Sequence, residues 1–236
     1  MTAMMARLAA MAFAGMMGAM PLAAGERGPI VVELFTSQGC SSCPPADALL
    51  GELSDRGDVL PLALHVDYWD YLGWKDVFAS PAYSKRQKNY ARAAGRRMVY
   101  TPQMIIGGAG AVVGTHPMDV ADLIRVERER EVNLSLKIAA AGQGTFRVAL
   151  RNGGDTGPYV VQLVHFEPHE LVEIRTGENA GEKIGYSNIV THWQVLSHWD
   201  GAAPLELTVS PAQDRPGAVL VQREGPGVIE AAARLP

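Results

Sequence analysis

The sequence predicts an α/β unit over residues 28–130, followed by a smaller, mostly β, sandwich-like unit over residues 132–236. The first observation is that apolar runs with strand and helix spacing alternate between residues 28 and 130, in the order β-α-β-α-β-β-α. The second is that the runs after residue 132 become short and strand-like, with turn residues between them. The third is the length, because 236 residues, 47% of them hydrophobic, suffice for one large or two small domains.

The elements of the first part are expected from local patterns. Strands are expected where apolar and β-branched residues run together, and helices where apolar residues recur every three or four positions. Gly57 ends the first helix, and Gly107-Gly108 forms a turn between the last two strands. The expected strands are 30–35, 59–68, 103–106 and 111–114, and the expected helices are 46–53, 81–94 and 118–130.

The second part is expected to contain mainly strands. Turn clusters at 142–144 and 152–155 separate short alternating runs, and the charged stretch 127–131 lies at the end of the preceding helix and marks the boundary. The expected strands are 133–139, 145–150, 159–166 and 205–209. Two His-Trp pairs with mixed spacing are expected in a core: His192, Trp193, His198 and Trp199.

The first 24 residues are expected to be a secretory signal peptide. They hold seven of the ten methionines, 19 of the 24 are apolar, and Arg7 is the only charge. A single basic residue, a short apolar run and the small residues Ala23 and Ala24 are typical of a cleaved export signal. We therefore expect a secreted, periplasmic protein with no stable membrane association after cleavage, in a compartment that favours disulfides.

The net charge of the chain argues against a nucleic acid as the partner. The chain has 21 basic and 25 acidic side chains and a formal charge of −4, so it lacks the basic surplus that a nucleic acid requires. Neither a cofactor nor a bound metal is expected.

The chemistry is expected to reside in the only two cysteines, Cys40 and Cys43. They stand directly before the first helix, whose N-terminus favours a thiolate. Cys40 is the expected nucleophile and Cys43 the resolving thiol, since two intervening residues bring both sulfurs to one helix edge. We therefore expect thiol–disulfide exchange with a protein or peptide thiol and with a redox partner protein.

The succession of strand, Cys40-Ser41-Ser42-Cys43, helix and, later, Thr101-Pro102 before a strand resembles the thioredoxin-like superfamily. The resemblance covers about residues 28–130 and implies a mixed sheet flanked by helices. It also implies that Pro102 is cis and packs beside the disulfide, and that the backbone of Thr101 pairs with a bound substrate strand. Four strings, ELFTSQGCSSCPPAD, HVDYWDYLGWKDVFASPAYSKRQ, VYTPQMIIGG and GENAG, are similar to bacterial secreted proteins of domain of unknown function family 1223.

Two departures from common thioredoxins leave questions open. Gly39 replaces the usual tryptophan, and the Ser41-Ser42 dipeptide leaves the direction of electron flow undecided. Glu33 is either the buried acid that exchanges a proton with Cys43, as a carboxylate does in thioredoxin, or a polar residue at the edge of the sheet.

Two other interpretations of the cysteine pair remain. One is a structural disulfide that closes a small loop. The other is a non-catalytic binding protein, for instance a periplasmic copper-handling protein in which His65 or His116 joins the two thiolates.

The loop from Tyr68 to Trp74 is rich in aromatic residues and acids. Its aromatics are expected either to recognise a polypeptide or to form a packed cap, and its acids to cap helices and turns. The basic residues Arg86, Arg96 and Arg97 could form surface ion pairs with these acids. The string 176–181 is expected to be a polar turn that faces the cleft between the two units.

Overall fold

The computed structural model describes residues 28–154, 156–211 and 213–236. The predicted signal peptide, residues 1–24, lies outside the described residues. Within the described part of the chain, no helix is both long and apolar enough to cross a membrane.

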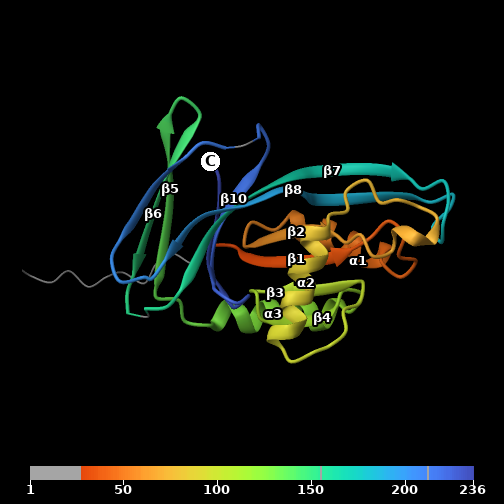
Figure 1. The fold of residues 1–236 in the computed structure, drawn as a ribbon, viewed down its shortest axis with the longest axis horizontal. Coiled ribbons are helices and arrows are strands. Elements are labelled where there is room, and N and C mark those ends of the chain that lie inside the picture. The colour runs from red at the N-terminus through yellow and green to blue at the C-terminus, as the bar shows by residue number, and fades with distance from the viewer. Residues whose placement is uncertain (1–27, 155, 212) are drawn as a thin grey trace, which may run out of the picture.

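An eight-stranded sheet runs through the molecule (Figure 1). Its strand order is β11-β10-β7-β8-β2-β1-β3-β4. β1 lies parallel to β2 and antiparallel to β3, and the long β7–β8 hairpin joins β2 through β8. The strands are β1 (Ile30–Thr36), β2 (Val59–His65), β3 (Gln103–Ile106), β4 (Gly110–Val113), β7 (Tyr159–Glu173), β8 (Lys183–Trp199), β10 (Gly217–Arg223) and β11 (Ile229–Arg234).

Helices cover both faces of the first part of this sheet. They are α1 (Pro44–Ser54), α2 (Pro81–Ala93) and α3 (Pro117–Glu129), with a short 3-10 turn η1 (Asp70–Leu72) before α2. Side chains of β1 alternate between the faces, as expected of a strand. Val32 and Leu34 pack with Leu50 of α1, whereas Val31 and Phe35 pack on the opposite face, which α2 covers.

A second sheet of three strands packs against the far end of the large sheet. Its order is β5 (Leu134–Gly142), β6 (Thr145–Asn152) and β9 (Leu205–Val209). Val148 and Leu150 of β6 share an apolar core with Val161 and Leu163 of β7 and Val219 of β10. This end of the molecule is therefore a two-layered β structure.

The boundary that was expected between the two units does not separate one sheet from the other. Four strands from the second part, β7, β8, β10 and β11, lie in the same sheet as β1 to β4. The second part therefore has no sandwich of its own, because the larger layer of its core belongs to a sheet that crosses the boundary at residues 130–132.

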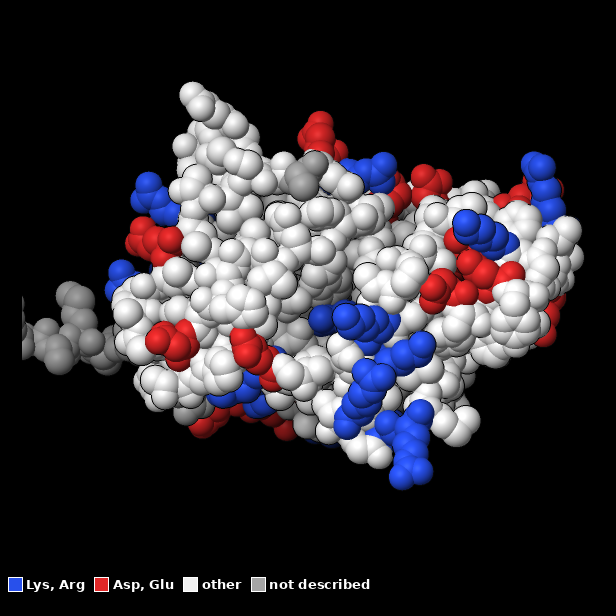
Figure 2. Space-filling model, in the orientation of Figure 1, with Lys and Arg blue, Asp and Glu red and all other residues white. Residues whose placement is uncertain are grey.

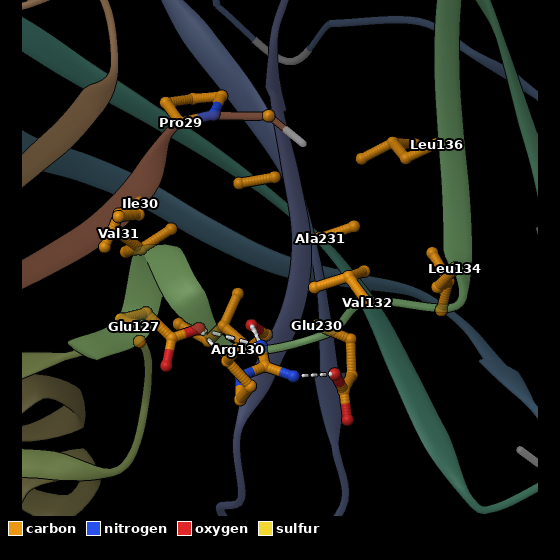
Figure 3. A pocket seen from close by; sticks show the side chains of 14 residues that line it. Pro29, Ile30, Val31, Glu127, Arg130, Val132, Leu134, Leu136, Glu230 and Ala231 are labelled. Carbon is orange, nitrogen blue, oxygen red and sulfur yellow. Dashed lines mark hydrogen bonds and ion pairs between the residues drawn. The ribbon is translucent and has the colours of Figure 1, made fainter. Parts of the chain in front are cut away.

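The charged stretch 127–131 connects the two parts of the chain at this boundary through hydrogen bonds of Arg130. Arg130 follows the end of α3 and donates to Glu127 (2.9 Å), to Glu230 of β11 (2.6 Å) and to the carbonyl of Ile229 (3.1 Å). Figure 3 shows Arg130 between Glu127 and Glu230, below a small pocket that β1, β5 and β11 also line. The expected place of this stretch at a helix end is confirmed, and its role is structural.

Candidate functional site

Cys40 and Cys43 form a disulfide at the beginning of α1. Their Cα atoms are 5.4 Å apart, and Cys43 is the N-cap residue of the helix. The loop is held by its own backbone, since the Cys43 N–H donates to the Cys40 carbonyl (3.2 Å) and the Cys40 N–H to Ser37 (3.1 Å). Cys40 is 4% exposed and Cys43 is fully buried, so both belong to the interior of the oxidised protein.

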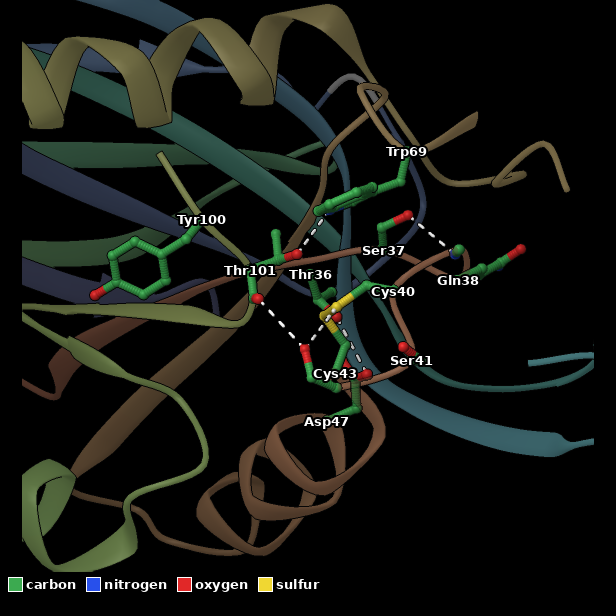
Figure 4. Close-up of a disulfide and its surroundings, with 12 residues drawn as sticks. Thr36, Ser37, Gln38, Cys40, Ser41, Cys43, Asp47, Trp69, Tyr100 and Thr101 are labelled. Atoms are coloured by element: carbon green, nitrogen blue, oxygen red, sulfur yellow. Dashed lines mark hydrogen bonds between the residues drawn. A yellow bond between two sulfur atoms is a disulfide. The ribbon is translucent and has the colours of Figure 1, made fainter. Parts of the chain in front are cut away.

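Thr101 and Pro102 lie beside this loop, and the bond between them is cis, as the resemblance implies. The hydroxyl of Ser42 donates to the Thr101 carbonyl over 3.5 Å and lies 3.4 Å from the sulfur of Cys40. The indole N–H of Trp69 donates to the Thr101 hydroxyl (2.7 Å). Figure 4 shows Trp69 and Thr101 on the same side of the disulfide.

The turn between β7 and β8 reaches the cysteine loop from the second part of the chain (Figure 1). The side-chain amide of Asn179 is buried and donates to the carbonyls of Gln38 (2.9 Å) and Cys40 (3.1 Å). The neighbouring Glu178 accepts a hydrogen bond from Ser41 (2.7 Å). These two residues were expected only in a polar turn. In the sequence, the polar string GENAG was the indication of these residues, and nothing in its neighbours predicted a contact with the cysteine loop.

A buried contact between Asp76 and His65 fixes the other side of the loop. Asp76 is 2% exposed, lies 2.7 Å from Nδ1 of the fully buried His65, and accepts from the backbone N–H of Gln38 (2.8 Å). The side-chain oxygen of Gln38 in turn accepts from the indole of Trp74 (2.8 Å). Asp76 and the indoles of Trp69 and Trp74 therefore pack around the cysteine loop and Thr101. The Tyr71 side chain, by contrast, is 76% exposed.

A buried acid, Asp47, lies next to the disulfide, and the sequence pattern had not pointed to it. Asp47 stands one helical turn after Cys43, is 3% exposed and accepts from the Thr36 hydroxyl (3.1 Å). Burial raises the pKa of Asp47 well above its usual value, the hydrogen bond from Thr36 lowers it, and the nearby charge of Asp76 raises it further. Figure 4 shows Asp47 beneath the cysteine pair, on the side where Thr36 lies.

Glu33 occupies a different environment from the one expected of a proton-exchanging acid. Its carboxylate accepts from Arg86 (2.5 Å) and from the hydroxyl of Tyr90 (2.5 Å), on the face of the sheet that α2 covers. Arg86 therefore pairs inside the protein and not with the acids of the aromatic loop. The guanidinium also lies 4.2 Å from the ring of Trp193. Glu33 and Arg86 form a buried structural ion pair.

The two histidines that were considered as copper ligands, His65 and His116, have other partners in the structure. His65 contacts Asp76 and packs edge-on against Phe78 and Tyr186, and His116 contacts Asp119 at the surface (3.2 Å). Among the residues that the structure describes, no three His, Cys, Asp or Glu side chains are grouped as metal ligands.

Comparison with solved structures identifies similar folds. A crystal structure of a structural genomics target from Agrobacterium tumefaciens is 35% identical, with a TM-score of 0.77, and the match covers 90% of this chain and 96% of that one. HBP35 of Porphyromonas gingivalis is 12% identical, with a TM-score of 0.58, over 88% of this chain and 74% of that one, and it shares the fold alone. No curated protein matches the chain. The model of the family described as protein of unknown function (DUF1223) matches residues 31–222, and the chain therefore belongs to the DUF1223 family.

Proposed function

We propose that this protein is a thiol–disulfide oxidoreductase that acts on a polypeptide through Cys40 and Cys43. The observation that carries the proposal is the position of the disulfide. It lies at the N-terminus of α1, beside Thr101-Pro102 and above the buried carboxyl of Asp47. A purely structural disulfide that closes so short a loop contributes little stability through chain entropy.

The reaction begins with the reduced pair and a disulfide in the substrate. The Cys40 thiolate attacks one substrate sulfur, so that a mixed disulfide forms and one substrate thiolate leaves. Cys43 then loses its proton and attacks the sulfur of Cys40, which restores the Cys40–Cys43 bond and releases the second substrate thiolate. The substrate gains two electrons and the protein loses two. The same steps in reverse oxidise a substrate dithiol.

The difference in exposure between the two cysteines supports their roles. Both cysteines are buried in the oxidised protein, but Cys40 keeps 4% exposure at the surface whereas Cys43 has none. Asp47 stands one turn after Cys43, and its raised pKa suits it to accept the proton that Cys43 must lose near neutral pH.

We assign the first part of the chain to the thioredoxin-like fold as part of this proposal. The strand order β2-β1-β3-β4, with α1 and α3 on one face and α2 on the other, supports the assignment. The substrate strand would lie along Thr101, whose carbonyl accepts, from the part of the chain that the structure describes, only a long hydrogen bond from Ser42. Tyr71, exposed and stacked on Trp69 with 6.3 Å between ring centres, offers apolar contact area next to it.

Export to the periplasm belongs to the same proposal. A Cys40–Cys43 disulfide persists in an oxidising compartment, whereas cytosolic reductants keep most thiols reduced.

A pair of trapping variants tests the proposal. Cys43→Ser should accumulate a mixed disulfide between Cys40 and a model peptide disulfide, because the resolving thiol is gone, whereas Cys40→Ser should accumulate almost none. Mass spectrometry of the unreduced proteins measures both adducts. Trapping through Cys43 alone would reverse the assigned roles, and trapping by neither variant would contradict the proposed function.

A further inference from the structure

The strongest charge asymmetry in the chain lies between Asp76 and Asp119. No Asp or Glu occurs between these two positions, but six Lys and Arg residues do. The rest of the chain has 15 basic against 25 acidic side chains. A net negative protein therefore carries one strongly positive segment, which runs along α2 and the loop that follows it.

Apart from Arg86, which pairs with Glu33 inside the protein, the basic side chains of this segment lie at the surface. Figure 2 shows Lys and Arg side chains gathered over α2 and past its C-terminal end. Four of them, Lys88, Arg92, Arg96 and Arg97, line a shallow hollow of about 320 Å³ together with Ala91 and Val99. We call these four residues the basic surface. All four are exposed, and none forms an ion pair with a carboxylate among the described residues.

The basic surface leads directly into the substrate wall of the proposed site. Val99 lines the hollow, and Thr101 follows it two residues later. Since an extended chain spans at most about 3.6 Å per residue, Arg97 and Thr101 are no more than about 14 Å apart. A polypeptide bound along Thr101 would therefore reach the hollow within about six residues of its cysteine.

We propose that the basic surface binds an acidic segment of the polypeptide whose cysteine reacts with Cys40. This inference rests on the proposed function and adds the class of substrate. Carboxylates of the partner would supply the counter-charges that the chain itself does not provide there, and they would mainly speed the encounter between the two proteins.

An acidic polypeptide fits this surface better than an anionic membrane does. A helix that lies on a membrane presents several large apolar side chains beside its basic ones. In the described segment 81–99, Met98 is the only large hydrophobic side chain that is strongly exposed.

Binding is tested with a fluorescent peptide in which Glu residues flank a serine in place of the cysteine, and with its Gln counterpart. The Glu peptide should bind more tightly, and its affinity should fall as salt is added. The triple variant Arg92→Gln, Arg96→Gln, Arg97→Gln should lower that affinity about tenfold. The matched control removes three exposed charges from the three-stranded sheet, Lys137→Gln, Arg147→Gln and Arg151→Gln, and should change the affinity less than about twofold.

Three results would overturn the inference. They are equal binding of the Glu and Gln peptides, equal losses in the two triple variants, and binding to phosphatidylglycerol vesicles that depends on the basic surface while the Glu peptide does not bind.

The exchange reaction distinguishes this inference from the proposed function. Wild-type protein should react faster with a Glu-flanked peptide disulfide than with a Gln-flanked one. The basic-surface variant should lose that preference and keep its rate with oxidised glutathione. If no disulfide reacts but the binding preference persists, the redox function is wrong and the acidic-segment surface stands. If both peptides react equally fast, the surface plays no part in substrate choice.

Discussion

Two buried carboxyls in the first half of the chain differ in what surrounds them. Glu33 is neutralised by Arg86 and receives a hydrogen bond from Tyr90, whereas Asp47 has only the Thr36 hydroxyl and a second carboxylate, Asp76, nearby. The sequence could predict an acid near the cysteines but not which one, because α1 turns Asp47 toward the disulfide while Glu33 points to the opposite face. The sequence feature that could have identified Asp47 is its position one helical turn after Cys43.

Replacing Asp47 with Asn should stabilise the oxidised protein at neutral pH. Because burial raises its pKa, the folded state binds the proton more tightly than the unfolded chain does. The stability that this proton contributes is present below the unfolded pKa and is lost as the pH rises toward the raised folded value. Asp47→Asn should therefore raise the free energy of unfolding at pH 7 and make it depend less on pH.

Urea unfolding at pH 5 and pH 8 measures this effect. Glu52→Gln, an exposed acid in the same helix, is the control and should change stability little. A loss of stability in Asp47→Asn at pH 8 would show that the carboxylate is better accommodated than its burial indicates.

Replacing Glu33 with Gln should destabilise the protein by about 3–5 kcal/mol, because Arg86 would keep its buried charge without a partner. The double variant Glu33→Gln, Arg86→Met should recover much of this loss. Chemical unfolding of both variants tests the prediction, and a neutral effect of Glu33→Gln alone would contradict a buried structural ion pair.

Among the secondary-structure elements, the β7–β8 hairpin contributes most to the site from far away in the sequence. Its turn places Asn179 against the cysteine loop, and the side chain of Asn188, at a positive φ of 49°, ties β8 to β2 by donating to the Pro61 carbonyl (2.9 Å). The hairpin thus holds in place both the cysteine loop and β2, the strand that ends beside this loop.

Asn179→Ala should cost about 1–3 kcal/mol, because two buried carbonyls, of Gln38 and Cys40, would lose their donor. Hydrogen exchange of the backbone amides in residues 38–43 should become faster. Asn133→Ala, at an exposed position just before β5, should alter neither quantity. Unchanged exchange in the loop of Asn179→Ala would mean that the hairpin does not hold it.

Local patterns predicted the elements of the first part and, in the second part, four of the seven strands: β5, β6, β9 and the first half of β7. The expected ranges agree with β1, α1, α2, β3 and α3 to within a few residues. β8, β10 and β11 were not predicted. β8 mixes polar and aromatic residues because it runs past several different environments, and β11 is rich in alanine, which favours helices in isolation. Only pairing with neighbouring strands makes them strands.

In the molecule as a whole, one sheet links parts of the chain that look like separate domains in the sequence. The core beneath α2 combines Phe35 and Leu62 of the first part with Phe166, Val190 and Leu220 of the second. Such pairing between distant strands depends on tertiary structure, which local patterns do not encode.

A fragment of residues 28–131 should therefore fail to fold as an independent domain. It would expose the edge of β2 and lose the apolar partners supplied by β7, β8 and β10. We expect poor dispersion in its amide NMR spectrum and no cooperative thermal transition, whereas residues 28–236 should show both. A well-dispersed spectrum and a cooperative transition in the fragment would contradict this account.

The central claim is that Cys40 and Cys43 form a redox-active couple, and the reduction potential of this disulfide tests it most directly. The protein is equilibrated with glutathione or dithiothreitol buffers of known potential, and the free thiols are counted after alkylation. We expect rapid, reversible exchange and a potential above about −300 mV, as for exchanging disulfides. A lower potential, with no exchange with peptide disulfides over hours, would show that the bond is structural and would contradict the account.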